Sequence, residues 1–104
     1  MATSILEPGT TAATSEEFVL EAGEQILLSA FTDAGGDMPS GVALTLQRAD
    51  INGNFISVST IGYGRIILSR GCQQITLSSP GTYRVARPEL SQFGTTVGVG
   101  VQSE

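Results

Sequence analysis

Residues 75–85 read ITLSSPGTYRV, and they contain the pattern on which most of the chain is built. A short alternating run ends in Ser-Ser-Pro-Gly, and Tyr83 then leads a second alternating run. Proline and glycine favour a tight turn, because proline fixes one backbone angle and glycine tolerates conformations that other residues avoid. The segment therefore predicts two successive β-strands joined by a turn.

The same alternation of short strand and turn extends in both directions from this segment. Apolar and polar residues alternate in VALTLQRA at 42–49, and Asn52-Gly53 is a strong hairpin signal after it. Further on, TTVGVGVQ at 95–102 alternates valine with glycine. Turn signals at intervals of about 8–12 residues are typical of a sandwich. We therefore predict an all-β protein, a single β-sandwich of seven or eight antiparallel strands.

The apolar positions of these strands predict the hydrophobic core. They alternate with polar positions, so that one face of each sheet is buried and the other faces water. The predicted core consists of Phe18, Leu20, Ile26, Leu28, Val42, Leu44, Leu46, Ile56, Val58, Ile66, Leu68, Ile75, Leu77, Tyr83, Val85, Val97 and Val99.

Residues 14–30 leave one alternative open. Thr14-Ser15-Glu16-Glu17 has the form of a helix-capping box, and apolar residues recur at four-residue steps from Phe18 to Ala30. Gly23 in the middle of such a helix would cost about 1 kcal/mol, and the turn signal at 22–24 interrupts the pattern. Strand, turn and strand is the interpretation that we favour.

Residues 1–15 differ from the rest of the chain, since they are rich in Thr, Ala, Ser, Gly and Pro and show no apolar period. We expect an extended N-terminal arm over 1–15 and a β-sandwich domain over 16–104. A fully stretched arm of this length reaches about 50 Å, enough to cross onto a neighbouring subunit. The alternative is a disordered terminus. Removal of residues 1–15 is expected to leave the melting temperature of the domain nearly unchanged.

Composition excludes several classes of function. At 104 residues, 40% hydrophobic and 14% charged, the chain has the balance of one globular domain. The net charge is −5, and nucleic-acid binding needs clustered cations, so we expect no nucleic-acid partner. No stretch approaches the roughly 18 apolar residues of a membrane span, and the N-terminus lacks the features of a signal peptide. We expect no membrane partner and synthesis in a host cytoplasm.

Charge is distributed unevenly along the chain. Residues 1–50 carry eight carboxylates and a single arginine, whereas residues 51–104 carry four arginines and two carboxylates. Opposite charges in the two halves favour contacts with copies of the same chain or with another protein. Ordinary solvated surface is the alternative interpretation.

Residues suited to catalysis or metal binding are few. The chain has no His and no Lys, so no ordinary base is present to activate its serines or Cys72. We interpret Cys72 as a small core residue. The loop at 50–54 begins like a calcium-binding loop, but the later ligand positions do not match, and a plain turn is favoured. Asp33 and Asp37 flank Ala34-Gly35-Gly36 and could share a metal, but Asp and Gly are also common in ordinary loops, and a plain loop is favoured. We expect no enzyme activity, cofactor, metal or small-molecule substrate.

Three groups of residues are candidates for binding a partner. Tyr63, between two glycines, is a candidate exposed contact. Arg84 and Arg87 lie on the strand led by Tyr83 and could form a cationic patch for a carboxylate surface, although a scattered arrangement is the alternative. The terminal strand Val97, Gly98, Val99, Gly100 and Val101 has one face without side chains, so a partner could approach by strand addition or face packing. Close internal packing is the alternative there.

The segment LSSPGTYRV at 77–85 resembles the strand-turn-strand of immunoglobulin-like sandwiches, in which a tyrosine near the start of a late strand packs into the core. The cysteine pair and core tryptophan of antibody domains are missing from the sequence. Because strand spacing does not reveal strand order, an immunoglobulin-like and a jelly-roll topology both stay open. The whole chain, with its small size and its strands rich in glycine and threonine, resembles small virion proteins of tailed bacteriophages, in particular head decoration or cement proteins. In that group a compact β-domain sits on the shell, and arms often reach across subunit junctions.

The resemblance implies a non-enzymatic structural virion protein that binds and stabilises the phage capsid surface. Its expected partners are the major capsid protein or another virion protein, together with copies of itself, and its expected location is the virion. Two alternatives stay open: a tail- or fibre-associated virion module, and a bacterial adhesin or glycan-binding β-domain.

Overall fold

The computed structural model describes residues 2–32, 35–39, 41–60, 64–65, 67–90 and 96–103. Within these ranges the chain contains strands and turns and no helix, which confirms the all-β prediction. The strands are β1 (Ala2–Gly9), β2 (Ala13–Thr14), β3 (Phe18–Leu20), β4 (Ile26–Thr32), β5 (Ala43–Ala49), β6 (Phe55–Ser57), β7 (Ser59–Thr60), β8 (Gly64–Arg65), β9 (Ile67–Ser69), β10 (Gln74–Leu77), β11 (Gly81–Arg87) and β12 (Val97–Ser103).

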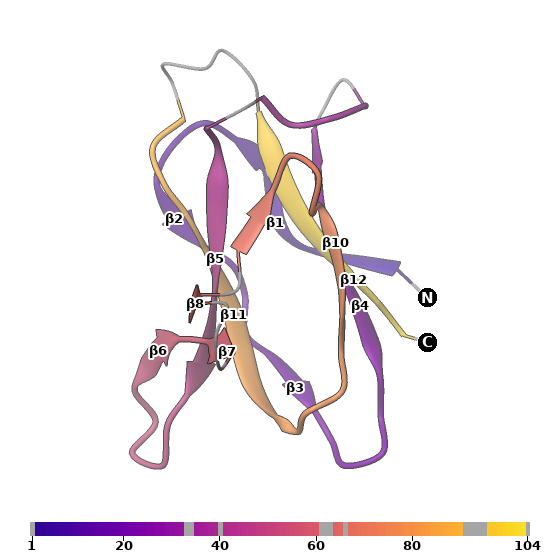
Figure 1. Cartoon of the computed structure of the whole chain (residues 1–104), viewed down its shortest axis with the longest axis vertical. Helices are drawn as coiled ribbons and strands as arrows, with labels where there is room; N and C mark the ends of the chain where they lie inside the picture. The colour runs from indigo at the N-terminus through magenta and orange to yellow at the C-terminus, as the bar shows by residue number, and fades with distance from the viewer. Residues whose placement is uncertain are drawn as a thin grey trace.

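Two antiparallel sheets form the sandwich (Figure 1). The first sheet has the order β1-β12-β4-β10. The second has the order β2-β11-β5-β6, with β3 also paired to β11 and β9 also paired to β5. Because β2 and β3 share one edge of β11, and β6 and β9 share one edge of β5, the second sheet likewise has four strand positions. The short β7–β8 pair lies between β6 and β9 in the chain.

This strand order is that of a jelly roll. Successive positions along the chain alternate between the sheets, except for the step from β5 to β6 and β9, which pair directly. A double sheet connected in this way contains two Greek keys. The immunoglobulin order places the first two strands beside each other in one sheet, whereas here β1 and the β2–β3 position lie in different sheets. The sandwich is confirmed, and of the two topologies that the sequence left open the strand order is the jelly roll, not the immunoglobulin-like one.

The segment 75–85 itself forms the predicted strands. Ile75 and Leu77 lie on β10 in the first sheet, and Tyr83 lies on β11 in the second, so the turn between them connects the two sheets. The Tyr83 hydroxyl donates a hydrogen bond of 2.7 Å to the carbonyl oxygen of Ser79. Its ring stacks on Phe18 with 5.6 Å between centroids. The local motif therefore stabilises the turn, although the strand order of the whole domain differs from that of an immunoglobulin-like sandwich.

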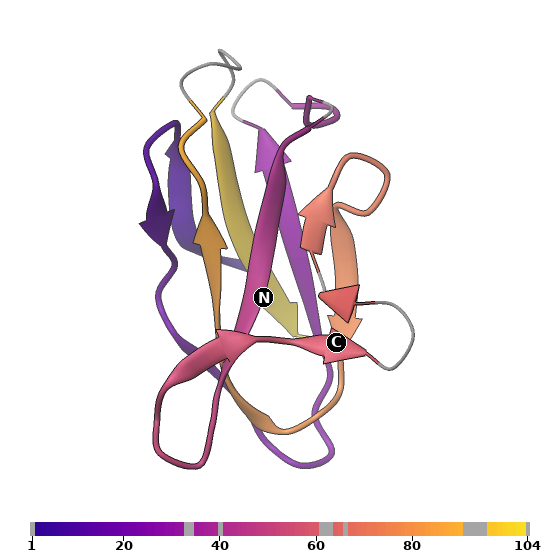
Figure 2. The same ribbon diagram turned by 60° about the vertical axis from the view of Figure 1, so that its left-hand side comes forward.

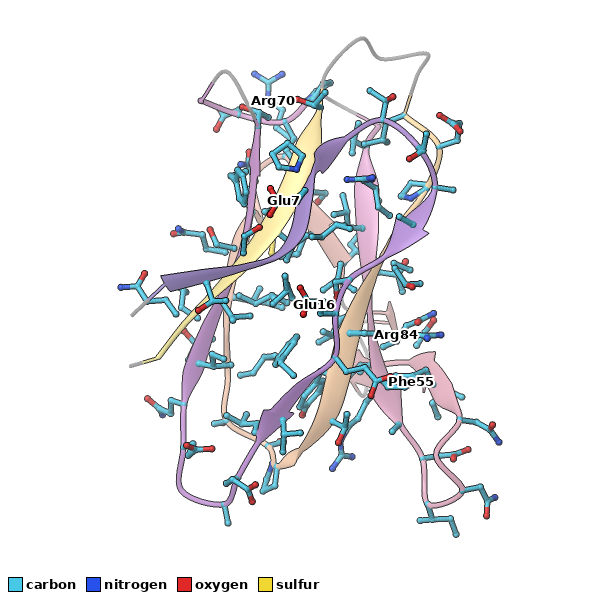
Figure 3. All side chains as sticks on the ribbon, turned by 180° about the vertical axis from the view of Figure 1, so that it is seen from behind. Glu7, Glu16, Phe55, Arg70 and Arg84 are labelled. Carbon is cyan, nitrogen blue, oxygen red and sulfur yellow. The ribbon has the colours of Figure 1, made fainter. Side chains whose placement is uncertain are left out.

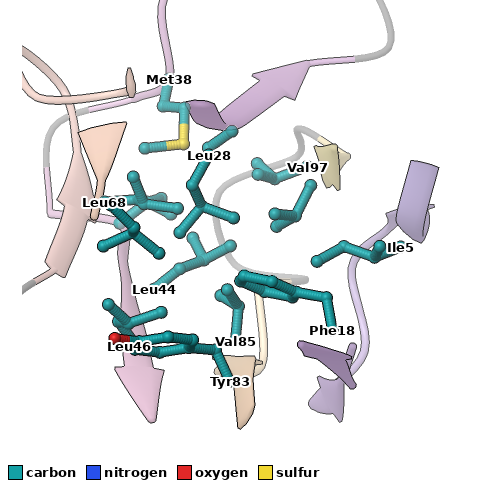
Figure 4. Close-up of a cluster of buried hydrophobic side chains, with 14 of the residues drawn as sticks. Ile5, Phe18, Leu28, Met38, Leu44, Leu46, Leu68, Tyr83, Val85 and Val97 are labelled. Carbon is teal, nitrogen blue, oxygen red and sulfur yellow. The ribbon is translucent and has the colours of Figure 1, made fainter. Parts of the chain in front are cut away.

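The core between the sheets contains most of the predicted residues (Figure 4). Ile26, Val58 and Ile75 are partly buried against it. Ile56 was predicted to be buried and is instead 57% exposed, because it lies where β6 extends past the end of the core. The prediction for Ile66 falls outside the described residues. Among the described residues, the core also contains Ile5, Ala30, Met38 and Leu90, which the pattern missed.

The prediction of a separate arm over residues 1–15 is wrong for the described part of that segment. Strand β1 pairs along β12, and the Ile5 side chain is buried in the core. The Glu16 amide donates to the Ile5 carbonyl at 2.9 Å, and the Ser15 amide donates to the Val85 carbonyl at 2.8 Å. Burial of Ile5 and these hydrogen bonds make the segment part of the sandwich. Its pairing with β12 also covers a strand edge that would otherwise face water.

The interpretation of residues 18–32 as strand, turn and strand is confirmed. Strand β3 pairs with β11 in the second sheet, and β4 lies in the first sheet between β12 and β10. The turn between them contains Gly23 at a φ of 85°, a conformation that a helix interior does not use.

Candidate interaction surface

Arg87 is an internal structural residue and not part of a cationic patch. Its side chain is only 5% exposed. The Nε atom donates to the Thr11 carbonyl at 2.8 Å, and Nη1 donates to the carbonyls of Glu7 at 2.9 Å and Val97 at 2.7 Å. Burial lowers the pKa of the guanidinium below its ordinary value, and the nearby Glu89 carboxylate opposes that change. The prediction that Arg87 binds a partner is therefore wrong, because the side chain alternates inward on β11.

Arg84 lies on the outer face of the second sheet, since it falls between the inward residues Tyr83 and Val85. Its Nε donates to the Gln47 side-chain oxygen at 2.7 Å, and its guanidinium lies 4.2 Å from the centroid of the Phe55 ring. Figure 3 shows Arg84 beside Phe55, while Arg70 lies far from both, near the top of the view. The described arginines are thus scattered, which was the alternative interpretation, and they form no common patch.

The strand β12 is interior to its sheet and does not offer a docking edge. It pairs with β1 on one side and with β4 on the other. Val97, Gly98 and Val99 are buried, and Gly100 and Val101 are partly buried. A strand with both edges paired has no free backbone for strand addition. Close internal packing, the alternative interpretation, is the one observed.

The glycines of β12 make room for neighbouring groups of the same chain. A Cβ atom built at Gly98 would lie 2.8 Å from the Leu6 carbonyl oxygen and 2.8 Å from the Phe31 ring. At Gly100 the nearest atom would be the Thr3 carbonyl oxygen at 3.3 Å. The bulged β1 strand and the Phe31 ring therefore occupy the space that glycine leaves. The groups that approach this flat face therefore belong to the same chain.

Cys72 was interpreted as a core residue and is instead exposed. It lines a hollow of about 570 Å³ beside Asp37, Gly35, Gly36 and Gln73. The Gln73 side chain accepts a hydrogen bond from the Met38 amide and donates one to the Ala30 carbonyl, so it links the loop at Met38 to strand β4. Among the described residues, no group of three potential metal ligands occurs. Asp33 and Tyr63 lie outside the described residues.

The loop at 50–54 is a plain hairpin turn, as favoured from the sequence. The Asp50 carboxylate accepts hydrogen bonds from the Asn52 amide at 2.9 Å and the Asn54 amide at 3.0 Å. The Asp50 carbonyl accepts the Gly53 amide at 3.0 Å, and Gly53 has a φ of 84°. Both amides bond to Oδ1 of Asp50, so the carboxylate orders the backbone of the turn.

The same turn carries an exposed apolar surface that sequence reasoning missed. Ile51 is 100% exposed at the turn, and Ile56 is 57% exposed on β6. Both line a hollow of about 510 Å³ with Ala49 and Val58. The signal available in the sequence was an isoleucine inside Asp-Ile-Asn-Gly-Asn, where turns ordinarily use polar residues. We call Ala49, Ile51, Ile56 and Val58 the hairpin surface.

Membrane-spanning helices and other exposed apolar side chains are further possible routes to a contact. Among the described residues, no helix is long and apolar enough to cross a membrane. Outside the hairpin surface, the large hydrophobic side chains described as exposed are Val19 on β3 and Ile67 on β9. Exposed apolar side chains that occur singly are normal on protein surfaces. The hairpin surface differs because two isoleucines line one hollow.

Comparison with known proteins gives a fold neighbour. No family model matches the chain, and no curated protein matches its sequence. Among solved structures, the SPBc2 prophage-derived protein YomS matches with a TM-score of 0.63 and 11% sequence identity. The match covers 100% of this chain and 92% of that chain. The two proteins share a fold. At 11% identity the likeness shows a shared fold over the whole domain and no functional detail.

Proposed function

We propose that this chain is a non-enzymatic structural protein of a phage particle, and specifically a decoration protein that binds and stabilises the outer surface of the capsid. The observation that carries the proposal is the fold shared over the full chain with a prophage-derived protein. The absence of His and Lys from the sequence, which removes the usual bases, agrees with a structural role.

The proposed mechanism is stabilisation by mass action. A protein that binds the assembled shell and not its separated subunits lowers the free energy of the assembled state. Each contact can be weak, because a shell repeats the same site many times and a subunit that spans two sites gains from effective concentration. The sandwich supplies a rigid body for such contacts, since its two sheets enclose a buried core and its interior strands are paired on both sides.

The copy number of the protein in purified phage particles tests the proposal. Quantitative mass spectrometry against the main shell protein is the measurement. We expect a count equal to that of the shell protein or a simple fraction of it. A handful of copies per particle would contradict a decoration role and indicate a tail or fibre module. Complete absence from particles would overturn the virion proposal and favour an adhesin or glycan-binding domain.

A further inference from the structure

We infer that the hairpin surface is the anchor through which this protein binds an apolar depression on the shell protein, with Ile51 as its central side chain. The inference rests on the proposed function and assigns the contact surface for it. Figure 2 shows the β5–β6 hairpin extending away from the two sheets at the lower end of the molecule.

The turn does not require isoleucine at position 51. The hydrogen bonds that hold it come from the Asp50 carboxylate and carbonyl and from the backbone amides of Asn52, Gly53 and Asn54. A type I turn accepts most residues at the position that follows its first residue, and polar residues are common there. The Ile51 side chain is fully exposed and contributes no buried area to the fold. Its apolar surface is therefore left for an external contact.

The turn also presents this side chain in a fixed position. The hydrogen bonds of Asp50 order the tip. At the base of the hairpin, Phe55 pairs with Ala49 across the two strands and packs under the Arg84 guanidinium. A preorganised contact residue binds more tightly because less conformational entropy is lost on association.

Charge on the hairpin favours an apolar protein surface as the partner. Its charged residues are Arg48 and Asp50. The Arg48 guanidinium donates to the Pro80 carbonyl, and Asp50 is engaged within the turn. Binding to nucleic acid or to anionic lipid requires clustered cations. The hairpin carries no such cluster, so its isoleucines are the groups that a partner would contact.

The size of the surface favours a repeated shell over a free dimer. Two exposed isoleucine side chains offer about 200 Å² of apolar area, whereas a stable interface buries about 800 Å² on each partner. A second copy held by this surface alone would dissociate in solution. On a shell, contacts of this size become sufficient because they are repeated and combined with others. We therefore assign the shell protein as the partner.

Binding of purified protein to shells that lack it tests the assignment. Shells come from a phage in which the gene is deleted, and bound copies are counted by sedimentation and quantitative mass spectrometry. The variants are Ile51→Ala and Ile56→Ala. Val19→Ala is the control, because Val19 is 58% exposed on β3, on the opposite side of β11 from the β5–β6 hairpin. All three variants are expected to melt like the wild type.

We expect Ile51→Ala to raise the apparent Kd at least about tenfold, as truncation of a central anchor does. Ile56→Ala should have a smaller effect, and Val19→Ala should stay within about twofold of the wild type, as a residue outside the interface does. Shells that bind wild type and Ile51→Ala equally would overturn the inference and leave the proposed function standing. Wild type that binds no shells would overturn both. An Ile51-dependent dimer in solution would show that the surface contacts a second copy and would overturn the assignment.

Discussion

Residues 2–15 and the tip of the β5–β6 hairpin are both peripheral, but they are held to the sandwich in different ways. The N-terminal segment pairs with β12, buries Ile5 and supplies the carbonyls of Glu7 and Thr11 to the Arg87 guanidinium. The tip of the hairpin is held by its own turn and by Phe55 at its base, and its Ile51 side chain is fully exposed. One segment is built into the fold, and the other extends from it.

The difference shows where a contact surface is to be sought in a small β-sandwich. Polar composition made residues 1–15 a candidate for reaching a neighbour, yet their backbone groups and Ile5 are used inside the molecule. The hairpin satisfies its own backbone and leaves apolar surface unused. Surface that the fold does not need is free to be selected for binding. The predictions below test this division, from the largest expected effect to the smallest.

Deletion of residues 1–15 is expected to abolish cooperative folding. It removes β1, the Ile5 side chain and the Ser15 hydroxyl that accepts the Val85 amide, and it exposes one edge of β12. The total stability of such a domain is about 5–15 kcal/mol, and these losses should consume most of it. Thermal unfolding followed by circular dichroism is the measurement. A truncated chain that melts like the full chain would restore the interpretation of this segment as a detachable arm.

Arg87→Met is expected to cost about 3 kcal/mol or more, because the carbonyls of Glu7, Thr11 and Val97 lose their buried donor. Arg84→Met, on the same strand but with one hydrogen bond on the outer face, is the matched control and should cost about 1 kcal/mol. Urea denaturation measures both. Equal costs for the two variants would show that the N-terminal segment is not held through Arg87.

Gly98→Ala is expected to destabilise the protein by about 1–3 kcal/mol, as overpacking of a filled site does. The added Cβ would meet the Leu6 carbonyl oxygen and the Phe31 ring at 2.8 Å. Gly100→Ala is the control, since its nearest atom would be at 3.3 Å and alanine restricts the unfolded chain. Differential scanning calorimetry should find Gly100→Ala close to the wild type. A neutral Gly98→Ala would mean that β1 and Phe31 can move away from β12.

The sequence predicted the fold class and most of the core because those depend on local alternation. Apolar and polar residues largely alternate in β5 and β11, and the inward residues Leu44, Leu46, Tyr83 and Val85 are buried. Topology depends on which strands pair over long separations. The Pro-Gly turn at 80–81 permits either a hairpin or a step between sheets, so residues 75–85 could not distinguish the two.

The candidate site was predicted less well, for reasons that are specific to each residue. Arg87 follows the inward alternation of Tyr83 and Val85, but a buried arginine is rare enough that exposure was the reasonable expectation. The glycines of β12 correctly indicated a close approach, and only the long-range pairing with β1 shows that the approaching backbone belongs to the same chain. Ile51 was visible in the sequence as an apolar residue in a polar turn, and its full exposure became evident only with the fold.

The smallest expected effect is that of Ile51→Ala on folding stability. An exposed residue without contacts usually contributes within about 0.5 kcal/mol, and Ile51 is fully exposed at a turn held by other groups. The same substitution at Ile5 removes a buried side chain and should cost about 2–5 kcal/mol. Paired urea titrations of the two alanine variants therefore compare the hairpin and the N-terminal segment with one chemical change. If Ile51→Ala were as destabilising as Ile5→Ala, the hairpin tip would be packed against the body of the protein, and its isoleucine would not be available to a partner.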